Sequence, residues 1–68
     1  DARVSSMLRV LQKLRESIPL FKFVVNPESF TQTVENIFDL SFLVKQGKAR
    51  VTMVDGLPYV GKQVKHGG

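Results

Sequence analysis

The 68-residue chain has no cysteine and no tryptophan, and it has only one histidine and one tyrosine. Without cysteine there can be no disulfide, no iron–sulfur cluster and no thiolate zinc site. The single histidine, His66, stands beside two terminal glycines, where one imidazole cannot form a metal site alone. A domain of this size buries only about 60% of the surface that its unfolded chain exposes. We therefore expect no cofactor, and we expect a partner to supply additional stability.

Long hydrophobic runs are also lacking, so no transmembrane span and no secretory signal is predicted, and no membrane partner is expected. An enzyme is not expected either, because the serines have no plausible histidine base and the glycines do not form a phosphate-binding loop. Glu35 and Asp39 lie one helical turn apart, but two carboxylates at this spacing usually belong to a solvated helix surface.

The first half of the chain predicts a helix followed by a short strand. Apolar residues recur at the spacing of one helical face over residues 2–16, without glycine or proline, and Pro19 is expected to end this helix. Residues 20–25, Leu-Phe-Lys-Phe-Val-Val, are rich in aromatic and β-branched side chains. We interpret this segment as a short strand or extended stretch.

A long second helix follows, with two possible starts. Asn26 before Pro27 is a good N-cap, and Ser29 with Gln32 matches a capping box, so the helix begins near Pro27 or near Phe30. It is expected to run to about residue 45, where a lysine suits the negative end of the helix dipole and a glycine at 47 suits the stop.

The C-terminal part predicts a β-hairpin. Residues 49–54 form one strand and residues 57–60 the other, joined by Asp55-Gly56, a strong two-residue turn signal. Pro58 cannot donate a hydrogen bond to a ladder, which places its strand at a sheet edge. Residues 61–68 are expected to be frayed.

Helix, short strand, helix and hairpin is the order of a winged-helix domain, an α+β fold in which the hairpin is the wing. The usual middle helix would have to be a single turn around residues 27–30. We expect one such domain over residues 1–68, cut from a longer protein.

The second helix is too apolar for a domain this small. Its apolar residues are Phe30, Val34, Ile37, Phe38, Leu40, Phe42 and Val44, and its polar face is formed by Gln32, Glu35, Asn36, Asp39 and Gln46. The apolar arc covers roughly 200°, twice the stripe that a surface helix needs, and Leu43 projects into the polar face. Either the rest of the domain buries all of this arc, or part of it is an exposed binding patch. The hairpin edge beside it could also add strands to a partner sheet.

A nucleic-acid-binding winged helix is the competing hypothesis, because the net charge is +4. Such a protein places its second main helix in the major groove, but this helix has two carboxylates and no basic residue before Lys45. The wing region could touch phosphates without sequence preference through Lys48, Arg50, Lys62 and Lys65. A solvated basic face explains the same residues, and we favour that interpretation.

Residues 26–47 resemble the C-terminal domain of the non-SMC element four kleisins, the kleisin subunits of the SMC five/six complex (SMC, structural maintenance of chromosomes). The blocks Thr-Val-Glu-Asn-Ile-Phe at 33–38 and Leu-Ser-Phe-Leu-Val at 40–44 carry the resemblance, together with Asp-Gly-Leu-Pro at 55–58. It covers roughly residues 18–60 without a gap. The first helix is similar only as a helix and shares no sequence motif with the family.

The resemblance implies a winged helix that binds the ATPase head of the SMC five partner. The N-terminal part of such a kleisin, outside this chain, binds the neck of the SMC six partner and contacts other subunits of the complex. This bridge closes a ring that holds DNA and supports DNA repair, which implies a nuclear, chromosome-associated protein. ATP and magnesium would belong to the head.

The expected partner-binding residues come from three arguments. Matching the helix by its final glycine implies contacts at Ile37, Phe38 and Ser41. The helical wheel adds Leu40 and Leu43. The hairpin offers Met53, Leu57 and Tyr59. Phe30 and Val34 are expected in the core instead.

Overall fold

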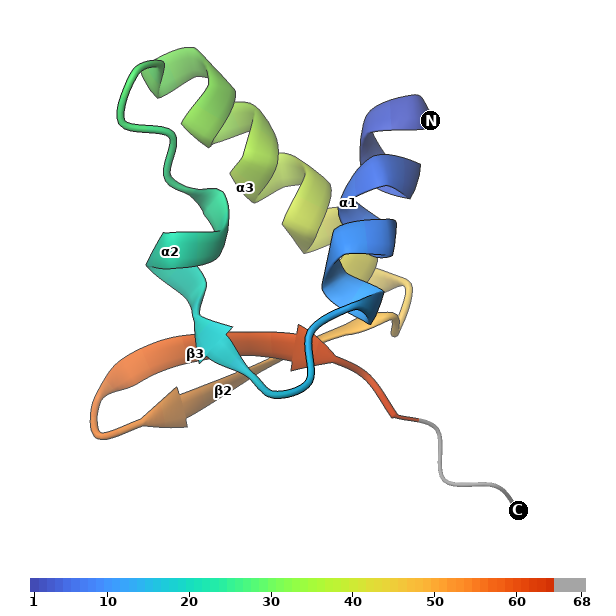
Figure 1. The fold of residues 1–68 in the computed structure, drawn as a ribbon, viewed down its shortest axis with the longest axis vertical. Helices are drawn as coiled ribbons and strands as arrows, with labels where there is room; N and C mark the ends of the chain where they lie inside the picture. The colour runs from blue at the N-terminus through green and yellow to red at the C-terminus, as the bar shows by residue number, and fades with distance from the viewer. Residues whose placement is uncertain (65–68) are drawn as a thin grey trace.

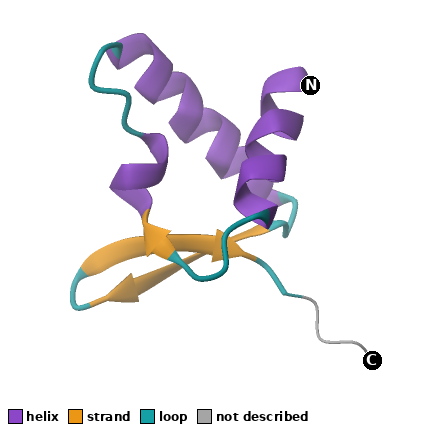
Figure 2. Ribbon diagram, in the orientation of Figure 1, coloured by secondary structure: helices purple, strands orange, loops and turns teal. Residues whose placement is uncertain are grey.

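In the computed structural model, which describes residues 1–64, three helices stand on one side of a small antiparallel sheet (Figure 1). In chain order the elements are α1 (Ala2–Gln12), β1 (Ile18–Pro19), α2 (Leu20–Val24), α3 (Phe30–Lys45), β2 (Ala49–Val54) and β3 (Leu57–Lys62). The α+β class is therefore confirmed (Figure 2). The element order agrees with the order expected for a winged helix, and membership of that fold family stays a prediction.

The hairpin forms as its local signals predict. Asp55 and Gly56 adopt φ of 51° and 81°, the left-handed values that both central residues of this turn type require. β2 occupies the predicted residues, and β3 pairs with it along its whole length, with Val51 opposite Val60. β3 also runs through Lys62, two residues into the segment expected to be frayed, because the ladder with β2 continues to Ala49. The expectation for residues 65–68 lies outside the described residues.

The strand that contains Pro58 is not at an edge, so this prediction is wrong. The strand order is β1-β3-β2, which puts β3 in the middle. In a two-residue hairpin the pair beside the turn exchanges hydrogen bonds and the next pair does not. Pro58 belongs to that next pair, opposite Met53, so its missing N–H lies on the β1 side. β1 already ends with Pro19 opposite Tyr59, and no ladder bond is lost there.

The long helix starts at the second of its two predicted positions. Ser29 has an extended backbone, and its Oγ accepts a hydrogen bond from the Gln32 backbone N–H at 3.0 Å, which caps α3. The Gln32 side chain donates to Asn36 instead of reaching back to Ser29, so only half of the capping box is made. α3 ends at Lys45 as expected, and Gly47 then takes a positive φ of 75°.

The segment expected to be a strand over residues 20–25 is the helix α2, and this prediction is wrong. α2 serves as the middle helix, whereas residues 27–30 make only a hydrogen-bonded turn, in which Ser29 N–H donates to the Asn26 carbonyl. Five residues are too few for a helical period to show in the sequence. Tertiary contacts decide the conformation: Val24 is fully buried, and its carbonyl accepts a bond from Asn36 Nδ2 at 2.9 Å.

α1 is shorter than expected, since it ends at Gln12 and not near residue 16. The following residues cross the end of the sheet to bring Ile18 beside Val60. Lys62 Nζ donates to the Gln12 carbonyl at 3.2 Å, which satisfies one of the free carbonyls at the helix end. None of the helices in residues 1–64 is both long and apolar enough to cross a membrane.

The core lies between the helices and the face of the sheet that is turned toward them. It draws at least one residue from every element except the short β1. Its buried members are Leu11, Val24, Leu40, Leu43, Ala49 and Val60.

Candidate protein-binding surface

α3 turns its more polar side toward the domain and its more apolar side outward. Asp39 is 7% exposed and Leu43 is 0% exposed, so the inner side of the helix includes positions from the polar half of the wheel. Phe30 is 82% exposed and Phe38 is 69% exposed on the outer side. The prediction that Phe30 belongs to the core is therefore wrong, and Val34 is only half-buried.

Polar side chains face inward because they satisfy backbone and charge partners there. Asn36 donates to the Val24 carbonyl at the end of α2, which would otherwise be unpaired in a buried place. Arg3 of α1 lies 3.1 Å from Glu35 and 3.7 Å from Asp39, so both carboxylates of α3 have a cationic partner. Glu35 and Asp39 thus attach α1 to α3, and the expectation that both are solvated is wrong for Asp39.

Two of the expected partner contacts are not on the surface. Leu40 is 4% exposed and Leu43 is fully enclosed, so both belong to the core. On the helical wheel Leu43 lies in the polar face of α3, which we expected to be exposed. In the structure that face packs against α1 and the sheet. Without unfolding, Leu43 offers no area to another protein, and Leu40 reaches the surface only in the lining of a small pocket between α3, α2 and β2.

The outer side of α3 forms what we call the α3 apolar face. Its exposed hydrophobic residues are Phe30, Ile37, Phe38, Phe42 and Val44. Ser41 lies among them, and its hydroxyl donates to the Ile37 carbonyl at 2.8 Å, so it does not need water. A shallow pocket of about 270 Å³ continues this face onto the sheet, between Ser41 and Val44 of α3, Leu20 of α2 and Val51 of β2.

The three hairpin residues expected to bind a partner lie on two sides of the sheet. Met53 is two residues from Val51 and shares its side, the one next to the α3 apolar face, and it is 65% exposed. Leu57 and Tyr59 pair with the alternate residues of β2 and so point to the reverse side. Met53 therefore lies toward the same side of the domain as Ile37, Phe38 and Ser41, whereas Leu57 and Tyr59 do not.

The basic candidates for nucleic-acid contact are only partly brought together. Arg50 and Lys62 line one small hollow of about 260 Å³, where Arg15 and Glu16 also lie. The Lys62 ammonium is engaged at the end of α1, and Lys48 stands in the turn before β2. Lys65 is outside the described residues. Their contact with nucleic acid stays a prediction.

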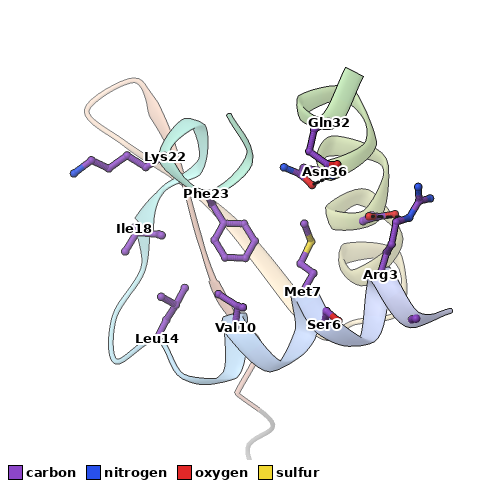
Figure 3. A pocket seen from close by; sticks show the side chains of 12 residues that line it. Arg3, Ser6, Met7, Val10, Leu14, Ile18, Lys22, Phe23, Gln32 and Asn36 are labelled. Atoms are coloured by element: carbon purple, nitrogen blue, oxygen red, sulfur yellow. Dashed lines mark hydrogen bonds and ion pairs between the residues drawn. The ribbon is translucent and has the colours of Figure 1, made fainter. Parts of the chain in front are cut away.

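A larger hollow of about 600 Å³ lies between the three helices (Figure 3). No residue of the α3 apolar face lines it. Phe23, Met7 and Val10 point toward one another across it, while the amine of Lys22 points away. Its polar groups are largely occupied, since Arg3 pairs with the carboxylates of α3 and Gln32 bonds to Asn36. No three side chains of the metal-ligating types gather anywhere in residues 1–64.

The comparisons with known proteins identify the family. The chain matches the family described as Nse4 C-terminal over residues 17–67. It is 51% identical over 66 residues to non-structural maintenance of chromosomes element 4 homolog A of Homo sapiens, covering 88% of the chain and 17% of that protein. It is 47% identical over 45 residues to non-structural maintenance of chromosome element 4 of Saccharomyces cerevisiae, covering 65% of the chain and 11% of that protein. No solved structure gives a significant match.

These observations define a small α+β domain with an outward-facing apolar helix. The chain belongs to the Nse4 C-terminal family. It spans less than a fifth of the length of the relatives it matches. The resemblance found in the central segment of the sequence is confirmed.

Proposed function

We propose that this chain is the part of an SMC five/six kleisin that docks on the ATPase head of the SMC five protein. Through this contact it helps to close the ring between kleisin and SMC proteins, in the nucleus and on chromosomes, in support of DNA repair. It acts by binding and not by catalysis. Other subunits of the complex would be reached by parts of the kleisin outside this chain.

The observation that carries the proposal is the exposure of the α3 apolar face. Phe30 and Phe38 are among the most exposed large hydrophobic residues described, and both are aromatic. Aromatic side chains in contiguous apolar patches are typical anchors of protein interfaces. Membership of the Nse4 C-terminal family supports a partner within the SMC five/six complex, and the exposed face supports this side of the domain as the place of contact.

The chemistry of this face favours a protein partner over nucleic acid. α3 has no cationic residue before Lys45, so it offers phosphates no cation along most of its length. A partner surface that covers the phenylalanines would remove apolar area from water, which is the main favourable term in such an association.

Binding of the purified SMC five head tests the proposal. We expect the chain to co-elute with the head in size-exclusion chromatography, and Phe38→Asp to abolish co-elution, because a carboxylate would be buried without a partner. Circular dichroism should show that this exposed substitution leaves the fold intact.

Val10→Asp is the matched control. Val10 is 55% exposed on α1 and lines the hollow between the helices, so an aspartate is again introduced at an exposed apolar residue, but away from the α3 apolar face. We expect this variant to co-elute with the head as the unaltered chain does. Failure of the unaltered chain to bind, or equal loss with both variants, would contradict the proposed site.

A further inference from the structure

The outer edge of β2 is the longest stretch of the sheet in which regular backbone remains unpaired within the described residues. β2 is the terminal strand in the order β1-β3-β2, and its only ladder is with β3. Beyond that ladder, no backbone hydrogen bond within residues 1–64 involves residues 49–54. All residues of β2 after Ala49 are exposed.

The hairpin register fixes which peptide groups point to this edge. Arg50, Thr52 and Val54 are opposite Gly61, Tyr59 and Leu57, in the pairs that exchange bonds within the hairpin. The bond from Gln63 N–H to the Lys48 carbonyl continues the same alternation.

The residues between these pairs therefore face outward. The N–H and C=O groups of Val51 and Met53 point away from β3, toward the free edge. Their side chains lie on the side of the sheet next to the α3 apolar face. An approaching strand would thus meet backbone and apolar side chains together.

This edge has few of the features that usually prevent pairing with another chain. Natural edge strands carry proline, bulges or inward-pointing charges, or another element covers them. Residues 51–54 of β2, Val-Thr-Met-Val, contain no charge and no proline, and they have high β propensity. The proline of the hairpin, Pro58, is on the protected middle strand.

We infer that the free edge of β2 accepts an extended strand from the SMC five head, which adds a fourth strand to the sheet. The inference rests on the proposed function, because the pocket beside Val51 joins this edge to the α3 apolar face. A single partner surface would then contact the helix face with side chains and the edge with backbone.

The side chains of β2 specify the kind of strand that fits. On the helix side the added strand would place apolar residues beside Val51 and Met53. On the reverse side it would place an acidic residue near Arg50, which has no ion pair within residues 1–64. A strand of about six residues would match the length of β2.

Hydrogen exchange distinguishes this pairing from side-chain contact alone. The 15N-labelled chain is allowed to exchange with deuterated solvent while it is bound to the head. Exchange is then quenched, the chain is released, and the remaining amide protons are measured by NMR. We expect the Val51 and Met53 amides to exchange at least tenfold more slowly in the complex than in the free chain. The Thr52 amide, already bonded to β3, should change much less. Equal exchange of Val51 and Met53 in both states would overturn the inference.

A backbone variant gives a second, independent test. Met53→Pro removes one outward N–H that makes no bond inside the domain, whereas Met53→Ala removes the side chain and keeps that N–H. We expect Met53→Pro to weaken binding of the head at least tenfold more than Met53→Ala does, as measured by calorimetry. Equal affinities of the two variants would count against the added strand. If Met53→Pro does not fold, the exchange measurement decides.

The outcomes also separate this inference from the proposed function. If Phe38→Asp abolishes binding but Val51 and Met53 remain unprotected, the head binds the helix face and the added strand is wrong. If the unaltered chain does not bind the head at all, the proposed function itself fails.

Discussion

At the scale of single residues, Leu43 shows how the position expected from a helical wheel can be the opposite of the position in the fold. On the helical wheel it stands among polar residues, which suggested an exposed hydrophobic contact. In the structure the polar residues themselves face inward, and Leu43 is fully buried in the core. A lysine at this position would therefore disrupt the fold before it could report on binding.

Leu43→Ala should destabilise the domain by about 2–5 kcal/mol, because it removes buried methyl groups and leaves a cavity. Since small domains have only a few kcal/mol to lose, we expect a substantial fraction of the variant to be unfolded at 25 °C without denaturant. Urea titrations followed by circular dichroism measure this fraction. Phe42→Ala, one position away and 47% exposed, is the matched control and should cost much less. A larger loss at Phe42 than at Leu43 would show that the orientation of α3 is wrong.

At the scale of elements, the start of α3 depends on one side chain. Ser29→Ala removes the hydroxyl that accepts the Gln32 N–H, and this should lower the free energy of unfolding by about 1 kcal/mol. Thr31→Ala, within the first turn and exposed, provides the control, because the Thr31 side chain makes no hydrogen bond within residues 1–64. Urea unfolding with an unchanged slope measures the difference. Equal stability of both variants would mean that Ser29 does not cap the helix.

Elements with strong local signals could be predicted from the sequence, and the others could not. The capping serine, the glycine after α3 and the Asp55-Gly56 turn each act within a few residues, so α3 and the hairpin were found at nearly their true bounds. α2 was missed because Leu20–Val24 has the composition of a strand and is too short for a helical period. Its conformation depends on burial of Val24 and on a bond from α3.

The direction in which α3 faces was the other feature that sequence reasoning could not settle. A helical wheel assumes that the apolar side is buried, but here the inner side combines the core residues Leu40 and Leu43 with polar residues whose partners lie far away in the sequence. Arg3 attracts the carboxylates, and the end of α2 needs the Asn36 amide. The signal available in the sequence was the excess width of the apolar arc, which did indicate that part of it stays exposed.

At the scale of the whole molecule, a small core and a large exposed apolar face have the same cause. The residues that would enlarge the core, Phe30, Phe38 and Phe42, point away from it. The free domain therefore exposes apolar area that an interface could bury. Its stability should depend on whether that interface is formed.

This dependence gives a prediction for the complete domain. A partner that binds only the folded state stabilises it by about 2.7 kcal/mol when its free concentration is a hundred times the dissociation constant. With the SMC five head at that excess, core amides such as that of Leu43, which exchange through global unfolding, should exchange about a hundredfold more slowly. The same measurement on Phe38→Asp should show no slowing, because the variant does not bind. Slowing confined to the α3 apolar face, with core amides unchanged, would mean that the head binds the unfolded chain about as tightly as the folded domain. The interface would then not complete the domain, and the area left exposed on α3 would need a different explanation.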